Sequence, residues 1–96
     1  MSMSIEETPE GLCLPLTLRL RGGLHARPAA RLAQEAQRFA ADISLRSDEA
    51  SADAKSMLDI LSLALPDEAH VTLVASGADA RQALEALAVC LDALRD

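Results

Sequence analysis

Leucine occupies every second position from Leu12 to Leu20, within the run LCLPLTLRLR. An unbroken period of two is typical of a β-strand that buries one face. Pro15 has no N–H to give to a sheet ladder, so the pattern predicts a strand at a sheet edge or with its N–H side free. Gly22 and Gly23 end the run.

The hydrophobic period changes to that of a helix at Ala26. From there to Phe39, apolar side chains recur every three or four residues, and charged and amide side chains occupy the opposite face. This pattern predicts an amphipathic helix over 26–39. Similar patterns predict strands over 41–47, 50–54 and 70–76, a short helix from Ser56 to Leu65, and a final helix over 80–94.

Polar residues mark the starts of the two later helices. Ser56 is followed three residues later by Asp59, which is a capping-box pattern in which each side chain binds the other residue's backbone amide. Asp79 and Gln82 repeat this spacing before the final helix. Both pairs indicate where a helix begins.

The predicted order of elements is β-α-β-β-α-β-α, joined by short connections. This order and the half-apolar strands favour an α+β fold, with an antiparallel sheet and helices packed on one face. The chain has 96 residues, enough for one small domain. We expect residues 1–11 to be a flexible tail and residues 12–96 to form the domain.

Composition and charge narrow the class of protein. The net charge of −6 argues against nucleic acid as a partner. No apolar run reaches the roughly 20 residues of a membrane helix, and the acidic N-terminus does not resemble a secretory signal. We therefore expect a cytoplasmic protein without membrane insertion. Cys13 and Cys90 lie in apolar patterns and are expected to be buried, reduced thiols, with no clustered ligands for a metal.

The stretch GLHARPAA, residues 23–30, opens the first predicted helix without a Ser, Thr, Asp or Asn to cap it. Pro28 suits a first helical turn because its missing N–H is not needed there. The free amides of Ala26 and Arg27, with the helix dipole, could hold an anion. Residues 12–34 also contain no Asp or Glu, and they hold four of the nine basic residues: Arg19, Arg21, Arg27 and Arg31.

His25 stands next to these open amides. A histidine can act as a nucleophile near neutral pH, and Arg27 can bind oxygen atoms with its forked guanidinium. The stretch therefore fits a histidine that accepts a phosphoryl group, whose oxygens are held by helix amides and Arg27. The alternative is a solvated histidine at a helix start beside arginines that are simply exposed.

GLHARPAA closely resembles the active-centre motif of the HPr family, the histidine-containing phosphocarriers of the bacterial phosphotransferase system. Two further stretches are similar to that family: AKSMLDILSLAL, residues 54–65, resembles its regulatory-serine region, and VTLVASGADARQALEAL, residues 71–87, resembles its last strand and helix. The resemblance covers about residues 12–94. It implies an open-faced β-sandwich, in which three helices cover a four-stranded antiparallel sheet whose first strand lies at an edge.

The resemblance implies that His25 is phosphorylated by enzyme I, with phosphoenolpyruvate as the original donor, and passes the group to a IIA or IIB component. Arg27 would neutralise the phosphate, and Pro28 would belong to the same active centre. Such a protein is a stoichiometric carrier, not an enzyme, and requires neither metal nor cofactor. We expect a monomer.

The second motif implies a regulatory site at Ser56, where HPr kinase/phosphorylase would place a phosphate. Asp59 stands where the family is expected to have a glycine or a basic residue, and it would repel that phosphate. The resemblance also implies an apolar docking patch beside His25, drawn from Leu24, Met57, Leu58 and Leu61.

Three alternatives remain open at this stage. A similar carrier could serve the nitrogen-related branch of the phosphotransferase system, although the Lys55–Ser56 pair favours the sugar-type carrier. A regulator that binds anions or proteins without being phosphorylated would not need the nucleophile His25. A small phosphate-processing enzyme would need an acid or base partner near His25, and the sequence offers none.

Overall fold

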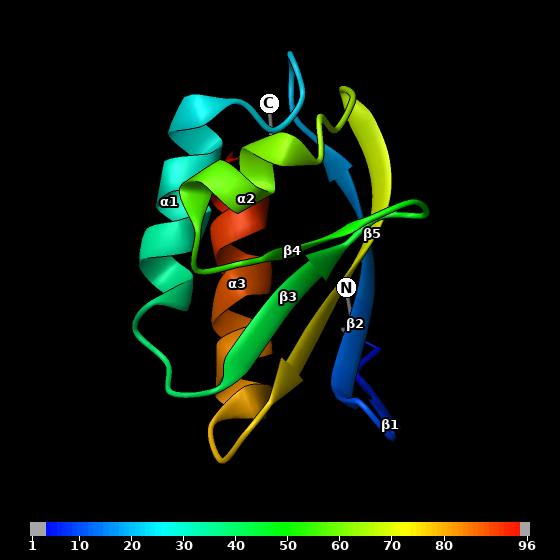
Figure 1. The fold of residues 1–96 in the computed structure, drawn as a ribbon, viewed down its shortest axis with the longest axis vertical. Coiled ribbons are helices and arrows are strands. Elements are labelled where there is room, and N and C mark those ends of the chain that lie inside the picture. The colour runs from blue at the N-terminus through cyan, green and yellow to red at the C-terminus, as the bar shows by residue number, and fades with distance from the viewer. Residues whose placement is uncertain (1–3, 95–96) are drawn as a thin grey trace.

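The protein is an α+β fold built on one antiparallel sheet. The computed structural model describes residues 4–94, and its sheet has the strand order β1-β2-β5-β3-β4, with every neighbouring pair antiparallel (Figure 1). The strands are β1 (Glu6–Thr8), β2 (Gly11–Arg19), β3 (Asp42–Arg46), β4 (Ser51–Asp53) and β5 (Glu68–Ser76). The predicted fold class is confirmed.

Three helices cover one face of this sheet: α1 (Ala26–Ala36), α2 (Met57–Ser62) and α3 (Ala80–Leu94). The apolar positions of the strands point toward them. Leu14 and Leu18 of β2 lie in the buried core with Leu73 of β5, as do Leu32 of α1 and Leu84 of α3. Period-two strands and period-3.6 helices thus bury their apolar faces against each other.

The sheet has one strand more than the four expected, and it lies in the predicted tail. Residues 6–8 pair with residues 11–13 of β2, and Glu10 at the turn makes two hydrogen bonds to the Arg46 guanidinium, of 2.9 and 2.7 Å. A flexible tail is therefore wrong for Glu6–Thr8, because three residues are too few to show a period of two. Residues 1–3 lie outside the described part of the chain.

Strand β2 remains an edge strand over most of its length. Strand β1 covers only Gly11–Cys13, and from Leu14 to Arg19 the described chain pairs β2 with β5 alone. Pro15 falls in this stretch, where a missing N–H on the free side leaves no ladder partner unsatisfied. Its position agrees with the edge strand that the sequence predicts.

The short helix α2 is capped by half of the predicted box. The Ser56 hydroxyl accepts a hydrogen bond from the Asp59 amide at 3.2 Å. The Asp59 carboxylate does not reach back to the Ser56 amide; it accepts from the Asp53 amide at 2.8 Å. The Ser56 amide instead donates to the Asp53 carbonyl at 3.0 Å. The reciprocal half of the box is therefore replaced by a bond to the end of β4.

Asp79 ties the start of α3 to the loop between α1 and β3. Its carboxylate accepts hydrogen bonds from the amides of Ala40 and Ala41, at 2.9 and 2.8 Å. These amides hold the pKa of the Asp79 carboxyl below its ordinary value. Asp79 stands at a helix start, as the sequence pattern predicts, and its carboxylate also fastens a loop that is distant in the sequence.

Both cysteines are free thiols, and each is half-buried rather than buried. Cys13 faces Thr8, with 3.4 Å between Sγ and Oγ1. Burial raises the pKa of the Cys90 thiol. Within residues 4–94, no helix is long and apolar enough to cross a membrane, and no group of three or more metal-ligating side chains is assembled.

Candidate functional site

A turn of two glycines brings the chain from β2 to the start of α1. Gly22 and Gly23 have φ angles of 79° and 76°, in the left-handed region that favours glycine. A Cβ atom on Gly23 would also collide with the carbonyl oxygen of Leu65, whereas a Cβ on Gly22 would meet nothing within 4 Å. Gly23 therefore lets the turn pack tightly against the segment that follows α2.

This turn is fastened to the residue that precedes β5. The Leu20 amide donates to the Asp67 carbonyl at 2.9 Å, and the Gly22 amide donates to the Asp67 carboxylate at 3.0 Å. No local pattern links Asp67 to a glycine 45 residues earlier, so sequence reasoning missed its role in placing the site.

His25 is exposed and occupies the N-cap position of α1. Its carbonyl accepts the first helical hydrogen bond, from Ala29 at 2.9 Å, but its side chain does not cap the helix. Instead, ring atom Nδ1 lies 3.0 Å from the Gly23 carbonyl oxygen. A carbonyl can only accept, so in this geometry Nδ1 carries the proton and the neutral ring has its lone pair at Nε2.

The first turn of α1 offers open amides beside His25. The first N–H groups of a helix have no partner within the helix, and Pro28 has none to offer. This leaves the amides of Ala26 and Arg27 at the positive end of the helix dipole, and no side chain of the part of the chain that the structure describes caps them. The arrangement predicted from the sequence, open amides next to a histidine, is thus present.

The arginines of the predicted basic region have different surroundings. Arg19 pairs with Glu68 at 3.5 Å, and Arg21 is engaged in a further contact. Arg27 is exposed and forms no ion pair within residues 4–94, so its guanidinium is available to an anion. Arg31 lies one helical turn further on the same face of α1, and it too is exposed.

The four residues proposed for docking differ in how far their side chains are buried. Met57 and Leu58 of α2 are exposed, with 37% and 74% of their surface accessible. Leu61 is half-buried and packs against the core. Leu24 is only 5% exposed, so its assignment to a docking surface is wrong. It directly follows the glycine turn, where the chain bends toward the core, and its side chain is part of that core.

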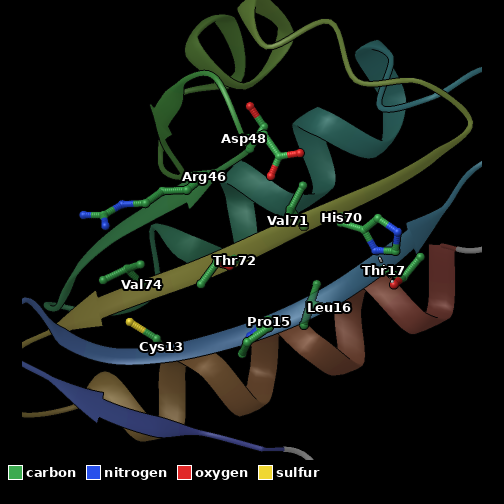
Figure 2. A pocket seen from close by; sticks show the side chains of 11 residues that line it. Cys13, Pro15, Leu16, Thr17, Arg46, Asp48, His70, Val71, Thr72 and Val74 are labelled. Carbon is green, nitrogen blue, oxygen red and sulfur yellow. Dashed lines mark hydrogen bonds between the residues drawn. The ribbon is translucent and has the colours of Figure 1, made fainter.

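A separate hollow of about 480 Å³ lies on the open face of the sheet, away from the helices (Figure 2). It is lined by side chains of β2, β3 and β5, among them Thr17 and His70, whose Oγ1 and Nδ1 atoms lie 3.1 Å apart. His70 is exposed. None of the residues at the start of α1 lines this hollow, so it is not part of the candidate site.

Most of the chain matches one known protein family. A family model described as the PTS HPr component phosphorylation site matches residues 15–93. The HPr-like protein Crh of Bacillus subtilis is 48% identical over 71 residues, 74% of this chain and 84% of Crh. The phosphocarrier protein HPr of Vibrio cholerae is 43% identical over 72 residues, 75% of this chain and 85% of that protein.

Solved structures agree with these matches. HPr-C-His from Thermoanaerobacter tengcongensis superposes with a TM-score of 0.81 at 33% identity, covering 85% of this chain and 92% of that one. A crystal structure of Bacillus subtilis Crh, described as an intertwined dimer with a swapped domain, gives a TM-score of 0.69 at 43% identity, covering 82% of this chain and 91% of that one.

Proposed function

Because this chain belongs to the HPr family of phosphocarrier proteins, we propose that His25 is the residue that carries the phosphoryl group. A member of this family is a phosphocarrier of the phosphotransferase system and not an enzyme. The observation that supports His25 is its position: an exposed ring at the N-cap of α1, beside two open amides and beside Arg27, which forms no ion pair among the described residues.

The transfer is an in-line displacement at phosphorus. A lone pair on the His25 ring forms a nitrogen–phosphorus bond while the bond between phosphorus and the donor residue of enzyme I breaks. The electron pair of the broken bond stays with the donor, whose phosphoryl group came originally from phosphoenolpyruvate. Positioning and electrostatic stabilisation supply most of the catalysis in such a step.

The Gly23 carbonyl decides which ring nitrogen is ready to attack. In the structure this carbonyl holds the proton on Nδ1, and Nε2 has the lone pair. Attack by Nδ1 would require this 3.0 Å contact to open and the proton to move to Nε2. The hydrogen bond therefore fixes the ring and links its tautomer to the glycine turn.

The amides of Ala26 and Arg27 would bind the phosphoryl oxygens, and the Arg27 guanidinium would neutralise their charge. An anion at a helix N-terminus is favoured by about 0.3–1 kcal/mol when exposed. A charge-assisted bond to arginine adds to this and can be bidentate. Pro28 would contribute by fixing the first helical turn without competing for the phosphate as a donor.

From His25 the group would pass to a IIA or IIB component of a sugar transport system, and a single-chain carrier suits this exchange. Met57 and Leu58 would contact these partners, because both are exposed on α2 next to α1. Ser56 would be a second phosphorylation site, used by an HPr kinase/phosphorylase. Its hydroxyl at the start of α2 supports this assignment, whereas Asp59 opposes it electrostatically.

A second candidate function is regulatory. The 48% identity to Crh favours it, since a solved structure of that protein is described as the Bacillus subtilis catabolite repression HPr. A carrier of the nitrogen-related branch is a further regulatory form. The presence of His25 in an open site favours a role that includes phosphoryl transfer in either case.

The test is a phosphotransfer assay with purified enzyme I, phosphoenolpyruvate and Mg²⁺, read by intact mass. We expect one added phosphoryl group that is lost in acid and absent from His25→Ala. Arg27→Ala should slow the transfer by about tenfold or more, since one charge-assisted bond contributes about 1.5–3 kcal/mol. The proposal would be contradicted if enzyme I phosphorylated another carrier but not this chain, and if the nitrogen-branch enzyme also failed to phosphorylate this chain.

A further inference from the structure

We propose that Asp67 is a positioning residue for phosphoryl transfer, which holds the ring of His25 in one orientation through the turn that precedes α1. Asp67 lies in the connection between α2 and β5, outside the three motifs of the sequence. This inference rests on the proposed function, because it gives Asp67 a part in the same reaction. Loss of the Asp67 carboxylate should slow the transfer step and leave binding of the phosphoryl donor unchanged.

Three hydrogen bonds lead from Asp67 to the ring of His25. The Gly22 amide donates to the Asp67 carboxylate at 3.0 Å. The next residue, Gly23, closes the turn by donating its amide to the Leu20 carbonyl at 2.8 Å. The Gly23 carbonyl then accepts from Nδ1 of His25 at 3.0 Å. A movement of Gly22 would therefore change the position of the carbonyl that orients the ring.

The Asp67 carboxylate holds the part of this turn that packing leaves free. Glycine has more backbone freedom than any other residue, so two glycines in succession make a turn that needs external support. Gly23 has this support, because it is buried against the Leu65 carbonyl. Gly22 is exposed, and a Cβ atom placed on it would meet nothing within 4 Å. The bond to Asp67 is thus the restraint on Gly22 that packing does not supply.

Asp67 is itself fixed on both sides. Pro66, which precedes it, has a locked φ angle and restricts the residue before it. Glu68, which follows it, is the first residue of β5 and pairs with Arg19 in the sheet. The Asp67 carbonyl also accepts from the Leu20 amide at 2.9 Å. The carboxylate is therefore attached to a rigid part of the backbone and can hold the turn in one place.

A fixed ring affects the transfer step more than the encounter with the donor. The attacking nitrogen must point at phosphorus in line with the bond that breaks, and a small misplacement of a reacting group lowers the rate strongly. The exposed residues proposed to contact partners, Met57 and Leu58, lie at the start of α2, whereas Asp67 follows its end. Removal of the Asp67 side chain should leave that contact surface intact.

The first experiment measures single-turnover transfer from phosphorylated enzyme I at a series of concentrations of this chain. We expect Asp67→Ala to lower the saturating rate about three- to tenfold, as for the loss of about one hydrogen bond, with the half-saturating concentration unchanged. Asp67→Asn removes the charge but keeps an oxygen acceptor for Gly22, and it should stay within about twofold of the unmodified chain. Asp67→Glu keeps the charge but moves the oxygens by one methylene group. It should also slow transfer, and it replaces Asp67→Ala if alanine unfolds the chain.

The second experiment follows the His25 ring by nitrogen NMR at a pH where the imidazole is neutral. The unmodified chain and Asp67→Asn should show the proton on Nδ1, whereas Asp67→Ala should show a mixture of both tautomers because the Gly23 carbonyl is no longer fixed. Asp48→Ala is the matched control, since Asp48 is exposed and has no hydrogen bond among the described residues. It should change neither the ring signals nor the transfer rate.

The outcomes separate this inference from the proposed function. Equal transfer rates or equal ring signals for Asp67→Ala and the unmodified chain would overturn the inference alone. A loss in Asp67→Asn as large as in Asp67→Ala would also overturn it, because the charge and not the hydrogen bond would then be responsible. Failure of the unmodified chain to be phosphorylated on His25 would overturn the proposed function and this inference with it.

Discussion

At the scale of single residues, the position of His25 depends on backbone atoms more than on side chains. The Gly23 carbonyl accepts from both the His25 amide and its ring, at 3.1 and 3.0 Å. Asp67 holds the amides of Leu20 and Gly22 on the other side of the turn. The ring is therefore oriented by a loop that is itself fixed at two points.

We predict different effects for alanine at the two glycines of this turn. Gly22→Ala should cost only the left-handed backbone penalty, about 1–2 kcal/mol. Gly23→Ala carries the same penalty and forces the Leu65 carbonyl away, which should add about 1–3 kcal/mol. Urea unfolding measures both values. Equal stability of the two variants would show that the close approach at Gly23 is not tight in solution.

At the scale of elements, short segments are held together by side chains that form hydrogen bonds to residues far away in the sequence. The loop after α1 is held by Asp79 at the start of α3 and by Lys55 before α2. The Gln37 side chain at the end of α1 also donates to the Lys55 carbonyl at 2.8 Å. Helix α2 has only six residues, so contacts of this kind stabilise it more than its own backbone bonds do.

The Asp79 contacts predict a dependence of stability on pH. Because amide donors lower the pKa of this carboxyl in the folded state, the unfolded chain binds the proton more readily. The contribution of Asp79 to the free energy of unfolding is complete above the ordinary pKa of an aspartate, and it is lost as pH falls through the lowered pKa of the folded state. Urea midpoints measured from neutral pH down into the acid range should therefore decrease.

Two substitutions together show how much of this pH dependence of stability is due to Asp79. Asp79→Asn should lower the midpoint at neutral pH and reduce its fall in acid. Asp48→Asn removes an exposed carboxyl without a hydrogen bond among the described residues, and it should change neither. Parallel acid profiles for Asp79→Asn and the unmodified chain would contradict the assigned role.

At the scale of the whole molecule, the candidate site and the N-terminal hairpin lie at opposite ends of β2. Figure 1 shows β1 at the lower end of the sheet and the loop before α1 at the upper end. The hairpin contacts β3 through the Glu10–Arg46 pair, which lowers the pKa of the Glu10 carboxyl. It adds to the sheet without approaching His25.

We therefore predict that removal of residues 1–9 lowers the stability of the fold but does not affect phosphoryl transfer to His25. The shortened chain should unfold at lower urea concentration, because it loses the pairing of β1 with β2. Its phosphorylation by enzyme I should be unchanged in rate and extent. A truncated chain that folds but accepts the phosphoryl group more slowly would show that the hairpin acts on the distant site.

Local sequence patterns were enough to predict the elements from β2 onward and the open helix start beside His25. Alternation in β2, the helical period after Ala26 and the glycine pair are local patterns, because side-chain direction repeats within a few residues along a strand or helix. They predict an α+β fold, with His25 beside open amides, and the structure agrees on both. The role of His25 itself stays a proposal.

The contacts between residues far apart in the sequence follow from the tertiary structure and not from any local pattern. Asp67 binds Gly22 across 45 positions, and Glu10 binds Arg46 across 36. The burial of Leu24 and the turn of Asp59 toward Asp53 also depend on how distant segments pack. Local periodicity carries no information about such pairs, since they form only after the sheet and helices have come together.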